Sequence, residues 1–318
     1  WDAPAWPPAG ARPARHTRPF LKVQDGCDRR CAYCVVPLAR GPSRSLPPGE
    51  ALRRIAALGA RHPEVVLTGV HLGAWGRDLS PPLALADLLR AVARARTVHR
   101  VRLSSVEPDE LPADALRDPA VASVLCDHLH LPVQSGSERL LRAMGRPGGA
   151  DALRRAVAAA ERAWPGACLG TDLIAGFPGE TDRDHAATLA LVRSLPLAYL
   201  HPFPFSARPG TAAAALDGGV PRSVVAERVA ELRAVSDALW RRFLDAQAGR
   251  TLEVVVERIA GGWARGTARA YATVRWRARA PGAFAGGAAG EARGGLVRVR
   301  VEGNDGTECV GSRAERIP

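Results

Sequence analysis

The chain has 318 residues and a mass of 33.6 kDa, enough for one large domain and a smaller one. Hydrophobic residues make up 47% and charged residues 24%, which excludes wholesale disorder. No run of 18 apolar residues and no signal peptide is present, so we expect a cytoplasmic protein without membrane contact. The first residue is Trp1 rather than Met, which indicates a piece of a longer protein.

The net charge of +12 and the isoelectric point near 10.7 favour a polyanionic partner. Lys22 is the only lysine, and the chain is crowded with Ala and Arg. That composition is typical of biased codon usage, so the overall charge favours nucleic acid only modestly.

Apolar runs and helical periodicity alternate from residue 20 to residue 203. The expected strands cover residues 20–23, 64–67, 98–103, 128–133, 168–175 and 198–203. The expected helices cover residues 50–61, 83–94, 109–117, 137–144, 151–163 and 180–194. This alternation predicts a parallel α/β sheet, which binds ligands at the carboxyl ends of its strands.

The pattern changes after residue 220. One long helix is expected over residues 221–248, and the segments that follow alternate polar and apolar residues as strands do. We therefore divide the chain into a linker or remnant (1–18), an α/β core (19–220), a connecting helix (221–249), a small antiparallel β unit (250–303) and a C-terminal tail (304–318).

Three of the six cysteines, Cys27, Cys31 and Cys34, lie on one loop after the first strand. Their C-x3-C-x2-C spacing suits three irons of a [4Fe–4S] cluster and leaves the fourth iron open. Zinc is the alternative, but a structural zinc site needs four ligands, and no fourth ligand stands at zinc spacing. Singly placed cysteines at 126, 168 and 309 are expected to be small buried hydrophobes.

Tyr33 stands directly before the third cysteine, and the motif resembles that of the radical S-adenosylmethionine (SAM) superfamily. Thr68-Gly69 resembles the motif whose backbone meets the amino group of SAM, and residues 174–180 resemble the adenine-side motif. The resemblance implies an open (β/α)6 partial barrel. It also implies a cluster that reduces SAM to release a 5′-deoxyadenosyl radical, with Cys27, Cys31 and Cys34 as metal ligands and catalytic residues.

Finer motifs resemble the methylthiotransferases of this superfamily. In chain order they are VQDGCDRRCAYC, VVLTGVHLGAWGRDL, VRLSSVEPDEL, HLHLPVQSGS, TDLIAGFPGET and HPFPFSARPGTAAA. Residues 250–303 resemble the family's RNA-binding TRAM domain. LSSVEP and LTGVH are most similar to the branch that modifies C2 of N6-threonylcarbamoyladenosine beside the tRNA anticodon. A ribosomal-protein aspartate methylthiotransferase and an inactive RNA-binding remnant are the alternatives.

The resemblance and the strand ends together give a set of expected cofactor-binding residues: Tyr33, Arg40, Thr68, Gly69, Ser105, Glu107, Gln134, Ile174 and Gly176. Arg40 and Arg44 are candidates for the SAM carboxylate or a substrate phosphate, against the alternative of solvated loop arginines. Asp28, Arg29 and Arg30 are expected at the surface.

His128 and His130 share one face of a strand, where packing in the barrel interior is favoured over a metal pair.

Residues 249–302 hold ten arginines and four glutamates, a net charge of +6, which is half of the charge of the whole chain. This concentration predicts RNA contact by the β unit. The candidates are Arg265, Arg269, Tyr271, Arg298 and Arg300. Trp263 and Trp276 are possible stacking groups, with core packing as the alternative.

The family implies tRNA and a reducing electron donor such as flavodoxin or ferredoxin as partners. Family members begin with a domain that carries three more cysteines for a second [4Fe–4S] cluster. No such cysteines precede Cys27. A second cluster is therefore expected only if that domain exists.

Overall fold

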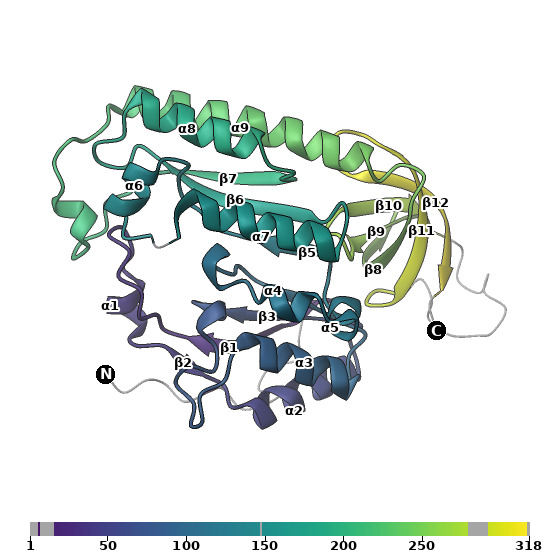
Figure 1. Cartoon of the computed structure of the whole chain (residues 1–318). Coiled ribbons are helices and arrows are strands. Elements are labelled where there is room, and N and C mark those ends of the chain that lie inside the picture. Colours follow the sequence, from purple (N-terminus) through teal and green to yellow (C-terminus); the bar gives the residue numbers. More distant parts are fainter. Residues whose placement is uncertain (1–5, 7–15, 147, 279–291, 317–318) are drawn as a thin grey trace.

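The computed structural model describes residues 6, 16–146, 148–278 and 292–316, and most of the expected linker lies outside them. Three sheets form the described part: a four-stranded sheet in the order β2-β1-β3-β4, a three-stranded sheet β5-β6-β7, and a closed barrel β10-β12-β11-β8-β9 (Figure 1). The core strands are β1 (Phe20–Asp25), β2 (Arg44–Ser45), β3 (Glu64–Gly69), β4 (Arg100–Leu103), β5 (His128–His130), β6 (Cys168–Ala175) and β7 (Tyr199–Pro204).

Six of these strands are parallel to their neighbours and form the expected partial barrel. β1, β3 and β4 pair in parallel, as do β5, β6 and β7. Backbone hydrogen bonds connect the two sheets between β4 and β5: Cys126 N donates to Val101 O (2.8 Å), and Val106 N donates to His130 O (3.0 Å). The short β2, which sequence analysis did not predict, pairs antiparallel with β1.

Helices cover the outer faces of both sheets (Figure 1). They are α1 (Val36–Arg40), α2 (Pro48–Gly59), α3 (Leu85–Ala95), α4 (Ala113–Leu116), α5 (Pro119–Val124), α6 (Glu138–Ala143), α7 (Gly149–Ala163), α8 (Asp182–Arg193) and α9 (Arg222–Asp245), with 3-10 turns η1 (Leu72–Ala74), η2 (Pro108–Glu110) and η3 (Ala212–Ala215). The apolar face of α3, with Leu85, Leu88, Leu89 and Val92, is buried at the spacing of an amphipathic helix. None of the described helices is long and apolar enough to cross a membrane.

The C-terminal unit is a closed five-stranded barrel, consistent with a TRAM-like domain. Its strands are β8 (Thr251–Ala260), β9 (Trp263–Ala268), β10 (Thr273–Arg277), β11 (Leu296–Asn304) and β12 (Cys309–Arg316). Its pairings are antiparallel except that β10 and β12 run parallel. The expected tail thus contains β12, the strand that closes the barrel. The weak apolar pattern of β12 gave no strand signal.

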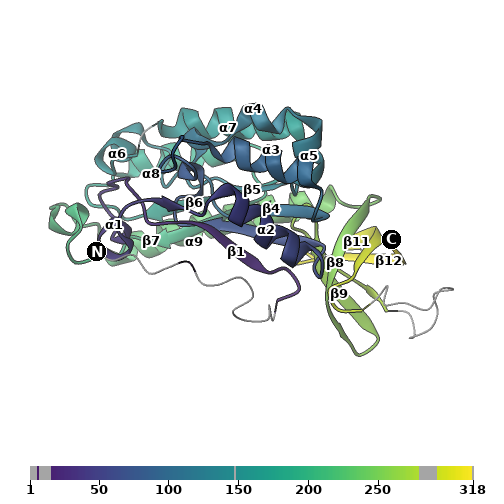
Figure 2. The ribbon, with the colours of Figure 1, turned by 90° about the horizontal axis from the view of Figure 1, so that it is seen from below.

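The barrel packs against the amino ends of the core strands, at the end of the core opposite α1 (Figures 1 and 2). A fully buried carboxylate, Glu64 at the start of β3, lies at this junction. Arg100 Nε donates to its Oε2 (2.7 Å), and Arg102 Nε donates to its Oε1 (2.8 Å). The same two arginines donate to barrel carbonyls, Arg100 to Glu253 O (3.1 Å) and Arg102 to Ala268 O (3.1 Å). One buried carboxylate therefore orients the two side chains that hold the barrel.

Burial by itself would raise the pKa of Glu64, but the charges of Arg102 and Arg100 outweigh it and lower the pKa to about 2. The folded-state pKa lies below the ordinary value of 4.5. The ionised carboxylate therefore contributes its full stabilisation above about pH 4.5 and loses it as the pH falls toward 2.

We predict that Glu64→Gln lowers the free energy of unfolding by about 3–5 kcal/mol, because two buried guanidiniums lose their counter-charge. Glu50→Gln, at a surface carboxylate that pairs with Arg53 and Arg54, should change the stability far less and serves as the control. Denaturant titrations between pH 2 and 7 measure both, and the stability of Glu64→Gln should fall less steeply below pH 4.5 than that of the unmodified chain. Equal losses in the two variants would contradict the role of Glu64.

Candidate active site

The cysteine loop leaves β1 through a turn that only glycine fits. Gly26 has φ +71°, and a Cβ there would lie 1.9 Å from Pro42 O. Cys27 N donates to Gly41 O (3.1 Å), and Cys34 N donates to Cys31 O (3.0 Å), which folds the loop back on itself. The three thiols are free and half-buried. Three thiols on one loop at the carboxyl end of a strand fit a [4Fe–4S] cluster.

Positively charged side chains lie beside two of the three thiols, Cys27 and Cys31, whereas burial raises the pKa of the Cys34 thiol. His71, after β3, places Nδ1 3.6 Å from Cys27 Sγ, and its Nε2 lies 2.6 Å from Glu110 Oε2. Burial would lower the pKa of His71, but its contacts with Cys27 and Glu110 raise it to about 9. Arg146 Nη1 lies 4.0 Å from Cys31 Sγ. Positive charge beside a thiol favours the thiolate, the form that binds metal, so the surroundings also fit a cluster.

Arg29 was expected at the surface, and the structure contradicts this. Only 13% of its side chain is exposed, and its guanidinium pairs with Asp109 (2.8 Å) and Glu110 (3.0 Å) on η2. Arg29 therefore joins the cysteine loop to the end of β4. The local sequence around Arg29, which lies between two cysteines, does not indicate ion-pair partners 80 residues away.

The other expected cofactor-binding residues lie mostly at the same strand ends as the cysteines. Thr68 and Gly69 end β3, and a Cβ on Gly69 would lie 2.9 Å from Gln24 Oε1. Gln134 N donates to Asp172 O (2.8 Å), and Ile174 N donates to Gln134 O (2.8 Å), so these residues lie side by side.

Gly176 follows β6 with φ +79°, and a Cβ there would lie 2.4 Å from Val225 on α9. Tyr33 is half-buried beside the thiols, and Ser105 is exposed after β4. Glu107 is paired within the chain, because Arg146 Nη1 donates to its Oε1 (2.9 Å). The strand-end edge thus brings together glycine backbone, polar side chains and three thiols.

The two loop arginines differ. Arg40 is exposed at the end of α1, and no described residue forms an ion pair with it. Arg44 Nη2 donates to Asp25 Oδ2 (3.2 Å), so it holds β2 against the end of β1. Of the two, Arg40 is the one left open to a ligand.

Two of the expected RNA-binding residues contact the core, and two others pair with carboxylates of the barrel, Arg265 with Glu308 (2.5 Å) and Arg298 with Glu253 (3.8 Å). Arg269 donates to Ser123 O (2.8 Å) and Ala122 O (2.7 Å), and the Tyr271 ring stacks on His128 at 4.1 Å between ring centroids. Both contacts hold the barrel on the core. Exposed side chains remain at Arg265, Arg298 and Arg300.

Of the two tryptophans, Trp276 is fully buried and fills the barrel core, which confirms the alternative to stacking. Trp263 lies beneath Arg277, 4.2 Å from ring centroid to guanidinium carbon.

His128 and the three single cysteines have packing roles. His128 Nε2 and His130 Nδ1 both contact the Tyr199 hydroxyl, at 2.9 Å and 3.1 Å, so His128 lies in the barrel interior as expected. The single cysteines at 126, 168 and 309 are all buried, and burial raises the pKa of each thiol. They are inert hydrophobes, as the sequence predicted.

The radical SAM superfamily model matches residues 21–192, more than half of the chain. The chain therefore belongs to the radical SAM superfamily, whose cofactors are a [4Fe–4S] cluster and SAM. It has the core of an enzyme of this family.

The chain is similar to two kinds of tRNA methylthiotransferase. It is 39% identical over 247 residues to the tRNA-2-methylthio-N(6)-dimethylallyladenosine synthase of Parafrankia sp., covering 77% of this chain and 50% of the relative. It is 41% identical over 243 residues to the threonylcarbamoyladenosine tRNA methylthiotransferase MtaB of Treponema pallidum, covering 76% of this chain and 50% of the relative. The chain thus spans about half the length of these curated relatives.

Solved structures share the fold. Coproporphyrinogen III oxidase HemN from Escherichia coli, a radical SAM enzyme, superposes with a TM-score of 0.52 at 15% identity over 82% of this chain and 69% of HemN. The methyltransferase TsrM from Kitasatospora setae, with cobalamin and a [4Fe–4S] cluster bound, also gives a TM-score of 0.52, at 17% identity over 79% of this chain and 42% of TsrM.

We predict that Cys31→Ala abolishes stable cluster binding, because two thiolates on this loop cannot replace three. Anaerobic reconstitution of the unmodified chain should give near four irons and four sulfides per chain with the brown absorption of such clusters. Cys126→Ala, at a buried thiol of the core, is the matched control and should retain the iron. Full iron content in Cys31→Ala would assign the cluster to other ligands.

Proposed function

We propose that the chain is the radical SAM part of a tRNA methylthiotransferase that acts on C2 of N6-threonylcarbamoyladenosine beside the anticodon. The observation that carries this proposal is the cysteine loop, which lies at the same strand ends as Gly69, Ile174 and Gly176. Similarity to tRNA methylthiotransferases over more than three quarters of the chain supports the reaction class.

Each group at this edge has a proposed task. Cys27, Cys31 and Cys34 would hold a cluster that, when bound, would supply the electron for SAM cleavage, and a donor such as flavodoxin or ferredoxin would reduce it. The backbone at Thr68-Gly69 takes the amino group of SAM, and Ile174 and Gly176 line its adenine. Ser105 and Gln134 bond the ribose and methionine, and Arg40 takes a carboxylate or phosphate. The reaction takes place in the cytoplasm.

Two of the three cysteines proposed to bind the cluster have a positively charged side chain beside them. Arg146, which pairs with Glu107, brings positive charge to Cys31. His71 does the same at Cys27, and Glu110 fixes its ring. His71 belongs to LTGVH, one of the two segments that favour threonylcarbamoyladenosine over dimethylallyladenosine as the substrate. LTGVH, which favours threonylcarbamoyladenosine as the substrate, thus also contacts the cysteine loop through His71.

The barrel is the proposed RNA interface, through side chains that are free of the core. Arg298 and Arg300 alternate with the buried Val297, Val299 and Val301, so both point outward from β11. Arg265 lies on β9, two strands away in the barrel order. Guanidinium groups on an outer barrel face suit the phosphate backbone of tRNA.

We predict that Arg298→Glu with Arg300→Glu weakens tRNA binding and lowers the salt dependence, by roughly 0.7–0.9 in log slope for each phosphate that the protein no longer neutralises. Filter binding or anisotropy across a salt series measures both quantities. Arg53→Glu with Arg154→Glu, at exposed positions on α2 and α7, is the matched control for net charge. The same affinity and slope in the barrel variant as in the unmodified chain would exclude this face.

The substrate is tested by deleting the full-length gene and digesting total tRNA for mass spectrometry. Threonylcarbamoyladenosine should accumulate without its methylthio form, while methylthiolated dimethylallyladenosine and the masses of ribosomal proteins stay unchanged. Loss of the dimethylallyladenosine product would assign the chain to the other tRNA branch. A missing methylthio group on a ribosomal aspartate, with tRNA unaffected, would refute a tRNA substrate.

A further inference from the structure

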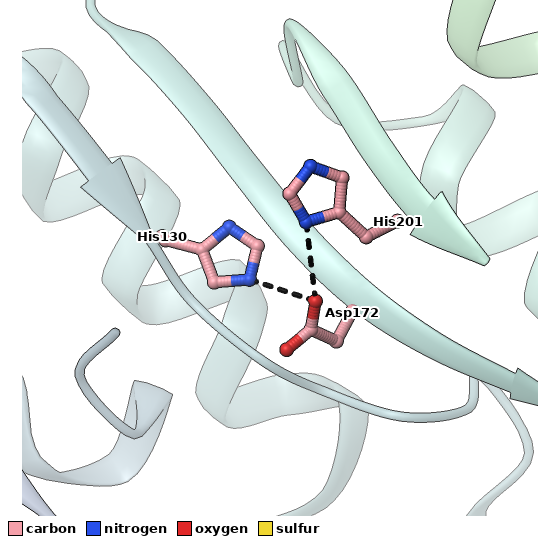
Figure 3. A group of neighbouring side chains, drawn as sticks. All are labelled: His130, Asp172 and His201. Carbon is pink, nitrogen blue, oxygen red and sulfur yellow. Dashed lines mark ion pairs between the residues drawn. The ribbon is translucent and has the colours of Figure 1, made fainter. Parts of the chain in front are cut away.

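Three polar side chains meet on neighbouring strands inside the core, and none of them was among the expected site residues. They are His130 on β5, Asp172 on β6 and His201 on β7 (Figure 3). His130 Nε2 lies 2.9 Å from Asp172 Oδ1, and His201 Nδ1 lies 3.5 Å from the same oxygen. We call these three residues the inner-wall cluster.

The inner-wall cluster lies on the face of the three-stranded sheet opposite the outer helices. Leu129, Leu169 and Leu173 are buried in the core that the outer helices cover. Side chains alternate along a strand, so His130 and Asp172 point to the opposite, inner face. His201 pairs in register with Asp172 and shares that face. All three side chains of the inner-wall cluster therefore lie on the same, inner face of sheet β5-β6-β7.

The inner face of this sheet is covered by aromatic side chains at the amino ends of its strands and leads to the proposed SAM site at their carboxyl ends. His128, Tyr199 and Tyr271 stack at the amino ends of the strands, where the barrel packs. In the other direction Asp172 stands two residues before Ile174, a rise of about 7 Å along a strand. The inner-wall cluster thus lies close to Ile174, the residue proposed to line the adenine of SAM, on the side toward the amino ends of the strands.

The same face carries two exposed aromatic rings. Phe203 follows His201 on the same face of β7, with ring centroids 6.4 Å apart and planes at 74°. The Phe203 residue is 51% exposed, and the His201 side chain is 55% exposed, although the rest of the inner wall is largely covered. Flat, exposed rings beside a hydrogen-bond acceptor are the groups with which proteins hold an unstacked base.

The charge of the inner-wall cluster also suits a nucleobase. Burial would raise the pKa of Asp172, but hydrogen bonds from His130 and His201 lower it to about 2, so the carboxylate is ionised. An ionised carboxylate only accepts hydrogen bonds, and bases offer N–H groups at their edges. A divalent metal is the other possible occupant of two imidazoles and a carboxylate, and the test below separates the two.

We infer that the inner wall is the subsite for the target purine base of the RNA. His201 and Phe203 stack on the flipped base, Asp172 accepts a hydrogen bond from its N–H edge, and His130 is a positioning residue that orients Asp172. The inference rests on the proposed function, because that function makes the ligand a nucleobase. It goes further by naming the residues that hold the base.

The test compares two anticodon stem–loop RNAs, one with adenine at the position after the anticodon and one abasic there. The full chain should bind the adenine RNA more tightly by about fivefold or more, the usual size of one stacking contact. His201→Ala with Phe203→Ala should bind both RNAs equally, with affinity for the abasic RNA unchanged. Asp172→Asn should lose part of the preference. Ile259→Ala, at an exposed apolar side chain on β8 of the barrel, is the control and should keep it.

Each outcome is decisive and separates this inference from the proposed function. An unmodified chain that binds neither RNA contradicts the proposed function and removes the basis of the inference. Binding of both RNAs with equal affinity, or a preference that survives His201→Ala with Phe203→Ala, overturns the base subsite alone. Stoichiometric metal beyond the cluster iron that disappears in Asp172→Asn makes the inner wall a metal site and also overturns it.

Discussion

The fold depends on one buried ionic contact, that of Glu64 with Arg100 and Arg102. A lone carboxylate or guanidinium at this depth would be strongly unfavourable, so the three side chains require one another. The arginines use their remaining donors on barrel carbonyls. As a result the contact fixes β3 against β4 and also determines which end of the core the barrel covers.

Because the barrel covers the amino ends of the core strands, their carboxyl ends remain available to ligands. The cysteine loop, Gly69, Gln134 and Ile174 all lie there, and the aromatic contacts of Tyr199 and Tyr271 lie at the other end. Between them the inner wall carries Asp172 and its two histidines (Figure 3). Along its strands the core therefore has packed aromatic side chains at the amino ends, the inner-wall cluster in the middle and the proposed cofactor site at the carboxyl ends.

Much of this arrangement could be predicted from local sequence. β6 begins and ends where its apolar run does, and the thiol spacing identifies the cysteine loop as the candidate cluster site without any knowledge of the fold. Local sequence could not show that Arg146 approaches Cys31, or that Glu110 pairs with His71, because these partners are 115 and 39 residues apart.

The barrel illustrates the same limit. Arg269 and Arg298 look alike as residues of a basic strand unit, and both were expected to bind RNA. Docking turns Arg269 onto the carbonyls of residues 122–125 and leaves Arg298 exposed. Composition gives the total charge of a surface, whereas tertiary contacts decide which charges remain available to a ligand.

The measurement that tests the central claim most directly is reductive cleavage of SAM by this chain. The reconstituted 318-residue chain, supplied with dithionite and SAM, should release 5′-deoxyadenosine and methionine in equal amounts, and Cys31→Ala should release neither. An iron-loaded chain that binds SAM and yet forms no 5′-deoxyadenosine would contradict the assignment of the strand-end edge as a radical SAM site.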